Sequence, residues 1–140
     1  MIQVKDIVKS FDGNVVLNHV SADFEDGKVN MIIGQSGSGK TVLMKSMIGL
    51  HMIDSGQIVF DTSGGKQQDL ASMTEKEVRM LHREVGMLFQ GAALFDSMTV
   101  QENVMYPLEM FSDMSKTEMV ERARFCLERV NMPERAFGLM

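Results

Sequence analysis

Long apolar runs, paired cysteines and an excess of basic residues are all missing from this sequence of 140 residues. No apolar stretch approaches the roughly 20 residues that a membrane-spanning helix needs, and no segment reads as a signal peptide. The single cysteine, Cys126, excludes an intramolecular disulfide, and its helical context predicts a half-buried, unreactive thiol. The net charge of −5 argues against nucleic-acid binding, because affinity for phosphate backbones comes from clustered lysine and arginine. Together these features predict a cytoplasmic protein.

The composition is otherwise that of a globular domain. Apolar residues make up 44% of the chain and charged residues 24%, which is ordinary for a soluble protein. The length predicts one domain that buries about two-thirds of its unfolded surface. Fifteen methionines are an unusually high number, and we interpret most of them as core residues in place of leucine.

Hydrophobic periodicity predicts an α/β order of elements. Strands are expected at residues 2–10, 15–24, 29–33, 57–61 and 85–90. Helices are expected at about residues 40–50, 74–84 and 116–130. The pairs Asp12-Gly13 and Asp26-Gly27 are turn signals, and Thr74 with Glu77 forms the pattern of a capping box.

The stretch GQSGSGKT, residues 34–41, stands between the predicted strand 29–33 and the helix that begins near Lys40. It matches the phosphate-binding pattern G-x-x-x-x-G-K-[ST] at each fixed position. Glycines allow a concave loop whose N–H groups point inward, and the positive end of the helix dipole points at the same place. The motif therefore predicts that the chain binds a nucleoside triphosphate. The predicted binding residues are Gly34, Gln35, Ser36, Gly37, Ser38, Gly39, Lys40, Thr41 and Val42, with Lys40 on the β- and γ-phosphates and Thr41 on Mg²⁺.

Hydrolysis of a bound triphosphate also needs a carboxylate for the Mg²⁺ shell and a group that orients water. Asp61 and Asp96 each end a short apolar run, and Asp61 begins a D-T-S-G sequence that resembles a GTPase element. Asp61, however, opens a polar glycine-rich loop, which favours a turn-forming role. No N-K-x-D motif and no following glutamate support either aspartate. A small kinase or GTPase using Asp61 is therefore the weaker interpretation.

The order of these motifs resembles the nucleotide-binding domain of ABC transporters. Phe11, in KSFDG, matches the aromatic position that stacks on adenine in that family, and a core residue of the hairpin is the alternative interpretation. The segment GMLFQGAALFDSMTVQENV matches the Gln-loop region, and Gln90 lies 90 − 40 = 50 residues after Lys40. The resemblance implies that Gln90 binds Mg²⁺ or the attacking water, so that Gln90 and Lys40 are the expected catalytic residues. His19, His51 and His82 are not expected to replace the family's switch histidine.

The resemblance implies a P-loop fold of ABC type, with an N-terminal antiparallel hairpin and a partial parallel core sheet covered by helices. Residues 1–33 are the expected antiparallel region, 34–98 the nucleotide-binding core as far as the Gln loop, and 99–140 the start of a helical subdomain. The family's signature loop, Walker B aspartate and switch histidine find no match here. We therefore expect an N-terminal fragment, or alternatively a shortened natural protein, that exposes sheet edges and self-associates. On its own it is expected to hydrolyse ATP very slowly or not at all.

The stretch GAALFDSMTVQENVMYPL resembles the ATPases of bacterial lipid-trafficking systems, which implies a phospholipid-related cargo. An amino-acid or lipoprotein-type exporter is the rival within the family. The implied partners are a second ATP-binding subunit, arranged head to tail, and a membrane permease. The permease would place a coupling helix near Gln90, in a cleft formed by Leu94, Phe95, Met98, Val100 and the expected helix 74–84, and the chain would lie on the inner face of the membrane. Anchoring of the loop to the core is the alternative role of Leu94 and Phe95. A nucleotide-binding module without catalysis remains the alternative function.

Overall fold

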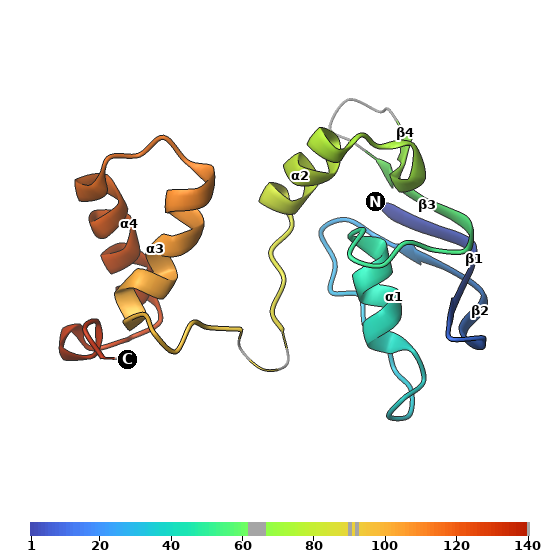
Figure 1. The fold of residues 1–140 in the computed structure, drawn as a ribbon, viewed down its shortest axis with the longest axis horizontal. Helices are drawn as coiled ribbons and strands as arrows, with labels where there is room; N and C mark the ends of the chain where they lie inside the picture. Colours follow the sequence, from blue (N-terminus) through green and yellow to red (C-terminus); the bar gives the residue numbers. More distant parts are fainter. Residues whose placement is uncertain (62–66, 90, 92, 140) are drawn as a thin grey trace. The chain divides into compact units, whose positions relative to one another are not determined.

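The N-terminal hairpin forms as the sequence predicts. A computed structural model of the chain describes residues 1–61, 67–89, 91 and 93–139. In it β1 (Ile2–Phe11) pairs antiparallel with β2 (Asn14–Phe24) (Figure 1). The turn between them has positive φ at both Asp12 (49°) and Gly13 (81°), which is the hairpin geometry that Asp-Gly favours.

Two further strands extend this hairpin into one sheet. β3 (Ser55–Asp61) pairs antiparallel with β1, and the short β4 (Gln67–Asp69) pairs antiparallel with β3. The strand order is therefore β2-β1-β3-β4. The segment 67–69, expected to be loop, thus becomes an edge strand.

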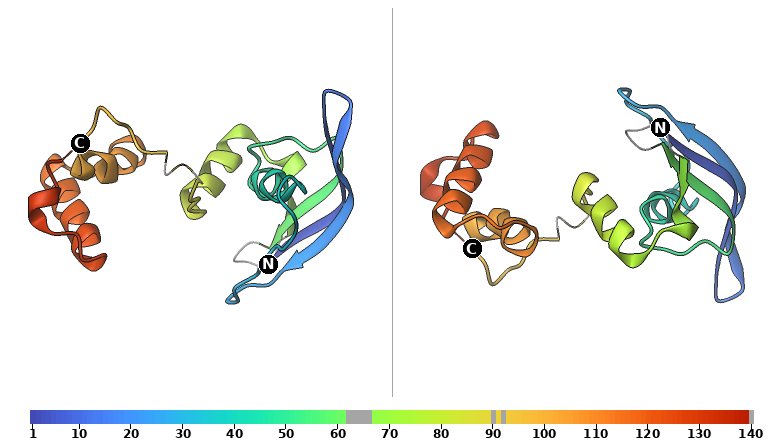
Figure 2. Two further views of the ribbon diagram at one scale, coloured as in Figure 1. Left: turned by 90° about the horizontal axis from the view of Figure 1, so that it is seen from below. Right: turned by 90° about the horizontal axis from the view of Figure 1, so that it is seen from above.

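The helices α1 (Lys40–Met47) and α2 (Glu75–Glu84) lie on the same side of this sheet (Figure 2). Ile7 and Ile58 on the strands are fully buried, and Leu43 and Met47 of α1 pack against them. α1 ends earlier than predicted, because Gly49 takes a φ of 76° just after the helix. The short η1 (Leu70–Ser72) precedes α2.

Two predicted strands, 29–33 and 85–90, are not strands in the part of the chain that the structure describes. Residues 29–33 and 85–89 are irregular, and Gln90 lies outside the described residues. Their side chains are open to solvent: Val29 is 94% exposed, Ile33 84% and Leu88 89%. A strand needs a neighbour to pair its backbone groups, and among the described residues no neighbour pairs with either segment. The predicted partial parallel sheet is therefore absent from the described sheet, which is wholly antiparallel.

The chain divides into two compact units, Met1–Gly86 and Met87–Met140. In the second, α3 (Val100–Phe111) packs on α4 (Lys116–Arg129), and η2 (Glu134–Ala136) follows. The buried side chains of this unit come from both helices and from the segment after them: Met105, Ala123, Leu127 and Phe137. Cys126 is half-buried in α4, as expected.

Of the four α-helices among the described residues, three begin with a complete capping box. At α2, α3 and α4 the hydroxyl of the N-cap threonine or serine accepts a hydrogen bond from the backbone N–H three residues on. The glutamate at that position accepts in turn from the backbone N–H of the N-cap residue. The pairs are Thr74 with Glu77, Thr99 with Glu102, and Ser115 with Glu118. These hydrogen bonds lower the pKa of each glutamate below its ordinary value. The box at α2 was predicted from the sequence; α3 was not predicted, although its box is visible in TVQE.

Candidate functional site

The loop of residues 34–39 leads directly into α1. Ser38 N–H donates to Gln35 O (3.2 Å), which closes a tight turn, and Gly37 within the loop has a φ of 80°. Gly39 is the N-cap of α1 with a φ of 87°, a conformation that disfavours any side chain. A Cβ on Gly34 would lie 2.8 Å from Ser38 Oγ and 3.8 Å from Lys40 Cδ, so glycine there keeps the inside of the loop open.

Gly39 is also where the loop rests on the sheet. It is buried, and a Cβ there would meet Leu17 Cδ2 at 3.1 Å, Val16 O at 3.1 Å and Val16 Cγ1 at 3.2 Å. Only a residue without a side chain fits this closely against β2. The loop is therefore positioned by the antiparallel sheet, and its anchor is a backbone contact.

The first turn of α1 keeps its N–H groups available. The first helical hydrogen bond runs from Leu43 N–H to Gly39 O (2.8 Å), so the N–H groups of Lys40, Thr41 and Val42 precede it. No side chain caps this end, and its first turn holds no acidic residue, whereas the other three helices have a glutamate there. Uncapped donors at the positive end of a helix dipole suit an anion such as a phosphate group.

Lys40 closes the loop from its helical side. Its Nζ donates to Gly34 O (2.8 Å) and to Gln35 O (2.6 Å), so the ammonium lies over the main chain of the loop. Thr41, the next residue, is exposed. The glycines and Lys40 suit binding of a polyphosphate. The Thr41 hydroxyl suits a hard cation whose other ligands are phosphate oxygens. In the part of the chain that the structure describes, no cluster of three acidic, histidine or cysteine side chains could hold a metal ion.

Phe11 lies at the end of β1, away from the main core. Its ring is 38% exposed and packs edge-on against His51, with ring centroids 5.4 Å apart. Lys9 Nζ lies 5.2 Å from the centre of the same ring. Phe11 is therefore a partly exposed aromatic surface next to the segment after α1, as a stacking residue requires, and it is not a member of the buried cluster.

In the second unit, the predicted docking residue Phe95 begins a turn that Met98 N–H closes by donating to Phe95 O (3.1 Å), and Leu94 directly precedes this turn. Leu94 is 65% exposed and Phe95 46% exposed. The Phe95 ring contacts Tyr106 at 4.8 Å between centroids. Asn103 holds the turn: its Oδ1 accepts from Phe95 N–H (2.8 Å), and its Nδ2 donates to the carbonyls of Phe95, Met98 and Thr99 (3.1 Å each). The sequence analysis did not single out Asn103.

The histidines and Asp61 have structural partners. His19 pairs with Asp6 (2.9 Å), and His82 Nε2 donates to Ile48 O at the end of α1 (2.6 Å). Asp61 accepts a hydrogen bond from Gln67 Nε2 (3.2 Å) across the β3–β4 pair. Asp61 is the last residue of β3, opposite Gln67, and the glycine-rich loop that was expected to follow it lies outside the described residues. Asp96 is exposed in a loop.

These features define the class of protein as a P-loop nucleotide-binding protein whose loop rests on an antiparallel sheet. The sequence profile described as ABC transporter matches residues 17–138. The chain belongs to the ABC transporter family.

Two similar proteins are the ATP-binding proteins of import systems. The chain is 35% identical to the phosphonates import ATP-binding protein PhnC of Fusobacterium nucleatum, over 98% of this chain and 56% of that protein. It is 36% identical to the methionine import ATP-binding protein MetN of Clostridioides difficile, over 96% of this chain and 40% of that one. The chain thus spans about half the length of the curated relatives it matches.

Solved structures show the same fold. The ATP-binding cassette MJ0796, in a dimeric post-hydrolysis state bound to ADP and Pi, superposes with a TM-score of 0.84 at 26% identity, over 99% of this chain and 60% of that one. The ABC-type α/β fold with its antiparallel hairpin is therefore confirmed. Among the described residues no helix has the length and apolar character to cross a membrane.

Proposed function

We propose that this chain is the nucleotide-binding part of the ATPase subunit of an ABC importer. The observation that supports it most directly is the loop 34–39, whose glycines keep a concave main chain open at an uncapped helix end. The cassette MJ0796, whose fold the chain shares, was solved with ADP and Pi. Nucleotide binding is the part of the family's activity that the described residues are equipped to perform.

The phosphate tail of ATP is held by backbone N–H groups of residues 35–42 and by the Lys40 ammonium. When ATP binds, Lys40 Nζ gives up its hydrogen bonds to the carbonyls of Gly34 and Gln35 and donates to the β- and γ-phosphate oxygens. Neutral acceptors are thereby replaced by charged ones, which form stronger hydrogen bonds. Thr41 is the proposed protein ligand of Mg²⁺, which neutralises phosphate charge when bound. Phe11 is proposed to stack on adenine.

Hydrolysis is proposed to depend on more than this chain provides. Gln90 is the proposed residue that orients the attacking water through its amide oxygen. A carboxylate base and donors to the γ-phosphate contribute several orders of magnitude to phosphoryl-transfer rates. Among the described residues no carboxylate pairs with Lys40 or caps α1. We therefore expect the chain by itself to bind ATP and to hydrolyse it slowly.

Transport is proposed to require a membrane permease and a second ATP-binding subunit. MJ0796 was solved as a dimer, which supports the second partner. The exposed Leu94 and Phe95 are the proposed contact for a permease helix, at the cytoplasmic face of the membrane. The relatives described above import phosphonates and methionine, so a small polar solute is better supported as cargo than the phospholipid that the Gln-loop region suggested.

Calorimetric titration with Mg-ATP tests the proposal. The wild-type chain is expected to saturate, and Lys40→Ala is expected to weaken binding about 10- to 150-fold, the value of one charge-assisted hydrogen bond. Lys45→Ala is the matched control, because it removes the same charge from the last turn of the same helix. Absence of saturation in the wild type, or equal losses in the two variants, would contradict a phosphate site at this loop.

A further inference from the structure

The end of β1, which carries Phe11, runs past the strand that pairs with it on one side. The pairing of β1 with β3 ends at Val8 opposite Ser55, so among the described residues no strand continues it along the last three residues of β1. Backbone N–H groups at such a place need another acceptor. Asp54, the residue directly before β3, provides one.

Asp54 contacts three consecutive residues of β1. Its backbone N–H donates to Val8 O (2.8 Å), its Oδ1 accepts from Lys9 Nζ (2.8 Å), and its Oδ2 accepts from Ser10 N–H (2.6 Å). The hydrogen bonds from Lys9 and Ser10 lower the pKa of the Asp54 carboxyl below its ordinary value, so this acceptor is charged at neutral pH. The carboxylate thus continues the pairing on the β3 side up to the residue before Phe11.

Asp54 also fixes the Lys9 ammonium beside the Phe11 ring. Lys9 Nζ lies 5.2 Å from the centre of this ring, within the range of a cation–π interaction. The Lys9 side chain is only 15% exposed, so its stem packs along the protein and the ion pair with Asp54 restrains its head. Without the carboxylate the ammonium would turn toward water, and the ring would lose this contact.

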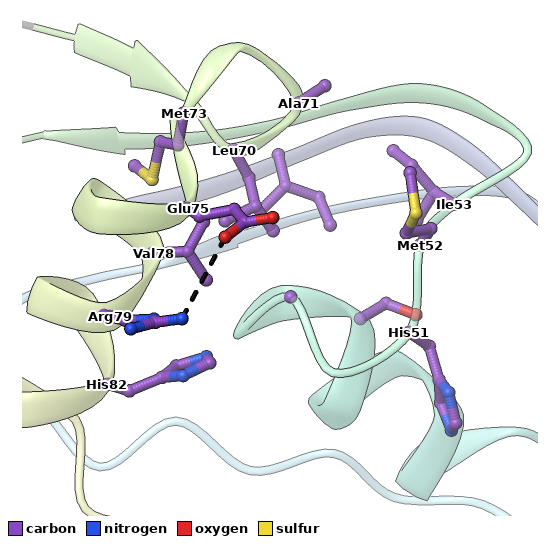
Figure 3. A pocket seen from close by; sticks show the side chains of 13 residues that line it. His51, Met52, Ile53, Leu70, Ala71, Met73, Glu75, Val78, Arg79 and His82 are labelled. Atoms are coloured by element: carbon purple, nitrogen blue, oxygen red, sulfur yellow. Dashed lines mark ion pairs between the residues drawn. The ribbon is translucent and has the colours of Figure 1, made fainter.

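The Phe11 ring has a second neighbour on the segment between α1 and β3. His51 packs edge-on against it, with an angle of 76° between the ring planes. In Figure 3, which looks into a cavity that this segment borders, the His51 ring points away from Leu70 and Val78. Asp54 lies on the same segment, so its bonds to β1 also hold His51 beside the ring. Phe11 is therefore restrained by two neighbours while part of its surface stays open to a ligand.

We propose that Asp54 is a positioning residue for the base of the nucleotide. Asp54 itself does not contact the nucleotide. It holds Lys9 and the end of β1, and these hold the Phe11 ring in the orientation on which a flat base stacks. The inference rests on the proposed function, because the stacking role of Phe11 comes from there. It adds that the base end of the site depends on a carboxylate outside the phosphate loop.

Two probes that share a phosphate chain separate the base end of the site from the phosphate end. Mg-ATP and Mg-tripolyphosphate are titrated separately into the chain by calorimetry. Phe11→Ala is expected to weaken ATP binding about 5- to 150-fold, the value of stacking one base, and to leave tripolyphosphate binding within about twofold. Asp54→Ala removes part of the same contribution, so we expect a loss of about 5- to 10-fold for ATP and at most about twofold for tripolyphosphate.

Two further variants make the result specific. Asp54→Asn keeps an oxygen acceptor for Ser10 N–H and loses the charge that pairs with Lys9, so a smaller loss of about threefold is expected for ATP. This variant replaces Asp54→Ala in each comparison if circular dichroism shows that the alanine variant is unfolded. Glu25→Ala is the matched control, because Glu25 is an exposed carboxylate of the same unit that pairs with Lys28. It removes the same charge and should change neither titration by more than about twofold.

A double variant tests whether Asp54 acts through the ring. In the Phe11→Ala background, Asp54→Ala is expected to change ATP binding by less than about twofold, because the group that it positions is already gone. Equal losses in the two backgrounds would show that Asp54 acts elsewhere. Equal losses of ATP and tripolyphosphate binding, or an ATP loss no larger than that of Glu25→Ala, would also overturn the inference.

Failure of the proposed function gives a different pattern. The wild-type chain then saturates with neither probe, or Lys40→Ala leaves both titrations unchanged, and the inference falls with the phosphate site. If both probes saturate and Lys40→Ala weakens both, the phosphate site stands. In that case an unchanged ATP affinity in Phe11→Ala or in Asp54→Ala refutes the inference about Asp54 alone.

Discussion

Two glycines of the phosphate loop have nearly the same backbone conformation and very different surroundings, which gives a sharp prediction. Gly37 has a φ of 80° with open space around it, and Gly39 has a φ of 87° against β2. An alanine in the left-handed region costs about 1–2 kcal/mol. Gly37→Ala should therefore lower the free energy of unfolding by about that amount. In Gly39→Ala the new Cβ also meets Leu17 Cδ2 and Val16 O, each at 3.1 Å.

Crowding of this kind lowers the free energy of unfolding by about a further 1–3 kcal/mol, because the main-chain oxygen of a paired strand moves less readily than a side chain. The expected loss for Gly39→Ala is then about 2–5 kcal/mol. Urea unfolding followed by circular dichroism measures the free energy of unfolding of both variants. An unchanged slope of that free energy against urea concentration shows that the denatured state is the same. Equal losses for the two variants, or a smaller loss at Gly39, would refute the idea that the loop rests on β2 through this contact.

Three further predictions concern other parts of the chain. Asn103→Asp places a carboxylate against three carbonyl oxygens, so the turn that holds Phe95 should loosen; Tyr106, the single tyrosine in a chain without tryptophan, should then lose near-ultraviolet circular dichroism. Ile33→Lys should reduce concentration-dependent association without lowering the unfolding midpoint, because that side chain is 84% exposed, and a lower midpoint would show it to be buried. The hydrogen bonds with Ser115 favour the ionised form of Glu118, so this carboxylate stabilises the fold at pH values above its ordinary pKa of 4.5. The contribution is lost as pH falls through the lowered pKa of Glu118. The stability advantage over Glu118→Gln, followed by thermal melts, should therefore disappear on acidification.

Local patterns allowed the best sequence predictions. The hairpin was predicted from Asp12-Gly13 and alternation, and α2 from its capping box, because both signals act over a few residues. The phosphate loop was recognised for the same reason. The boundaries of α1 were less certain, since the sequence alone does not show that Gly49 adopts a positive φ and ends the helix after Met47.

Features that depend on distant residues were predicted less well. The pattern VNMII is typical of a buried strand, yet Val29 and Ile33 are exposed, since a strand forms only when a neighbouring strand pairs with it. Asn103 could not have been selected, because its role follows from four hydrogen bonds to one turn and from no motif.

The phosphate loop itself does not depend on the strand that was expected to precede it. Its shape comes from its own glycines and turn, its donors from the first turn of α1, and its anchor from the contact of Gly39 with β2. β2 is held in turn by the hairpin, which forms from adjacent residues. A phosphate site built this way can be complete while residues 29–33 remain unpaired. Under the proposed function, nucleotide binding and hydrolysis therefore have separate structural requirements, and the loop 34–39 with the first turn of α1 bears on binding alone.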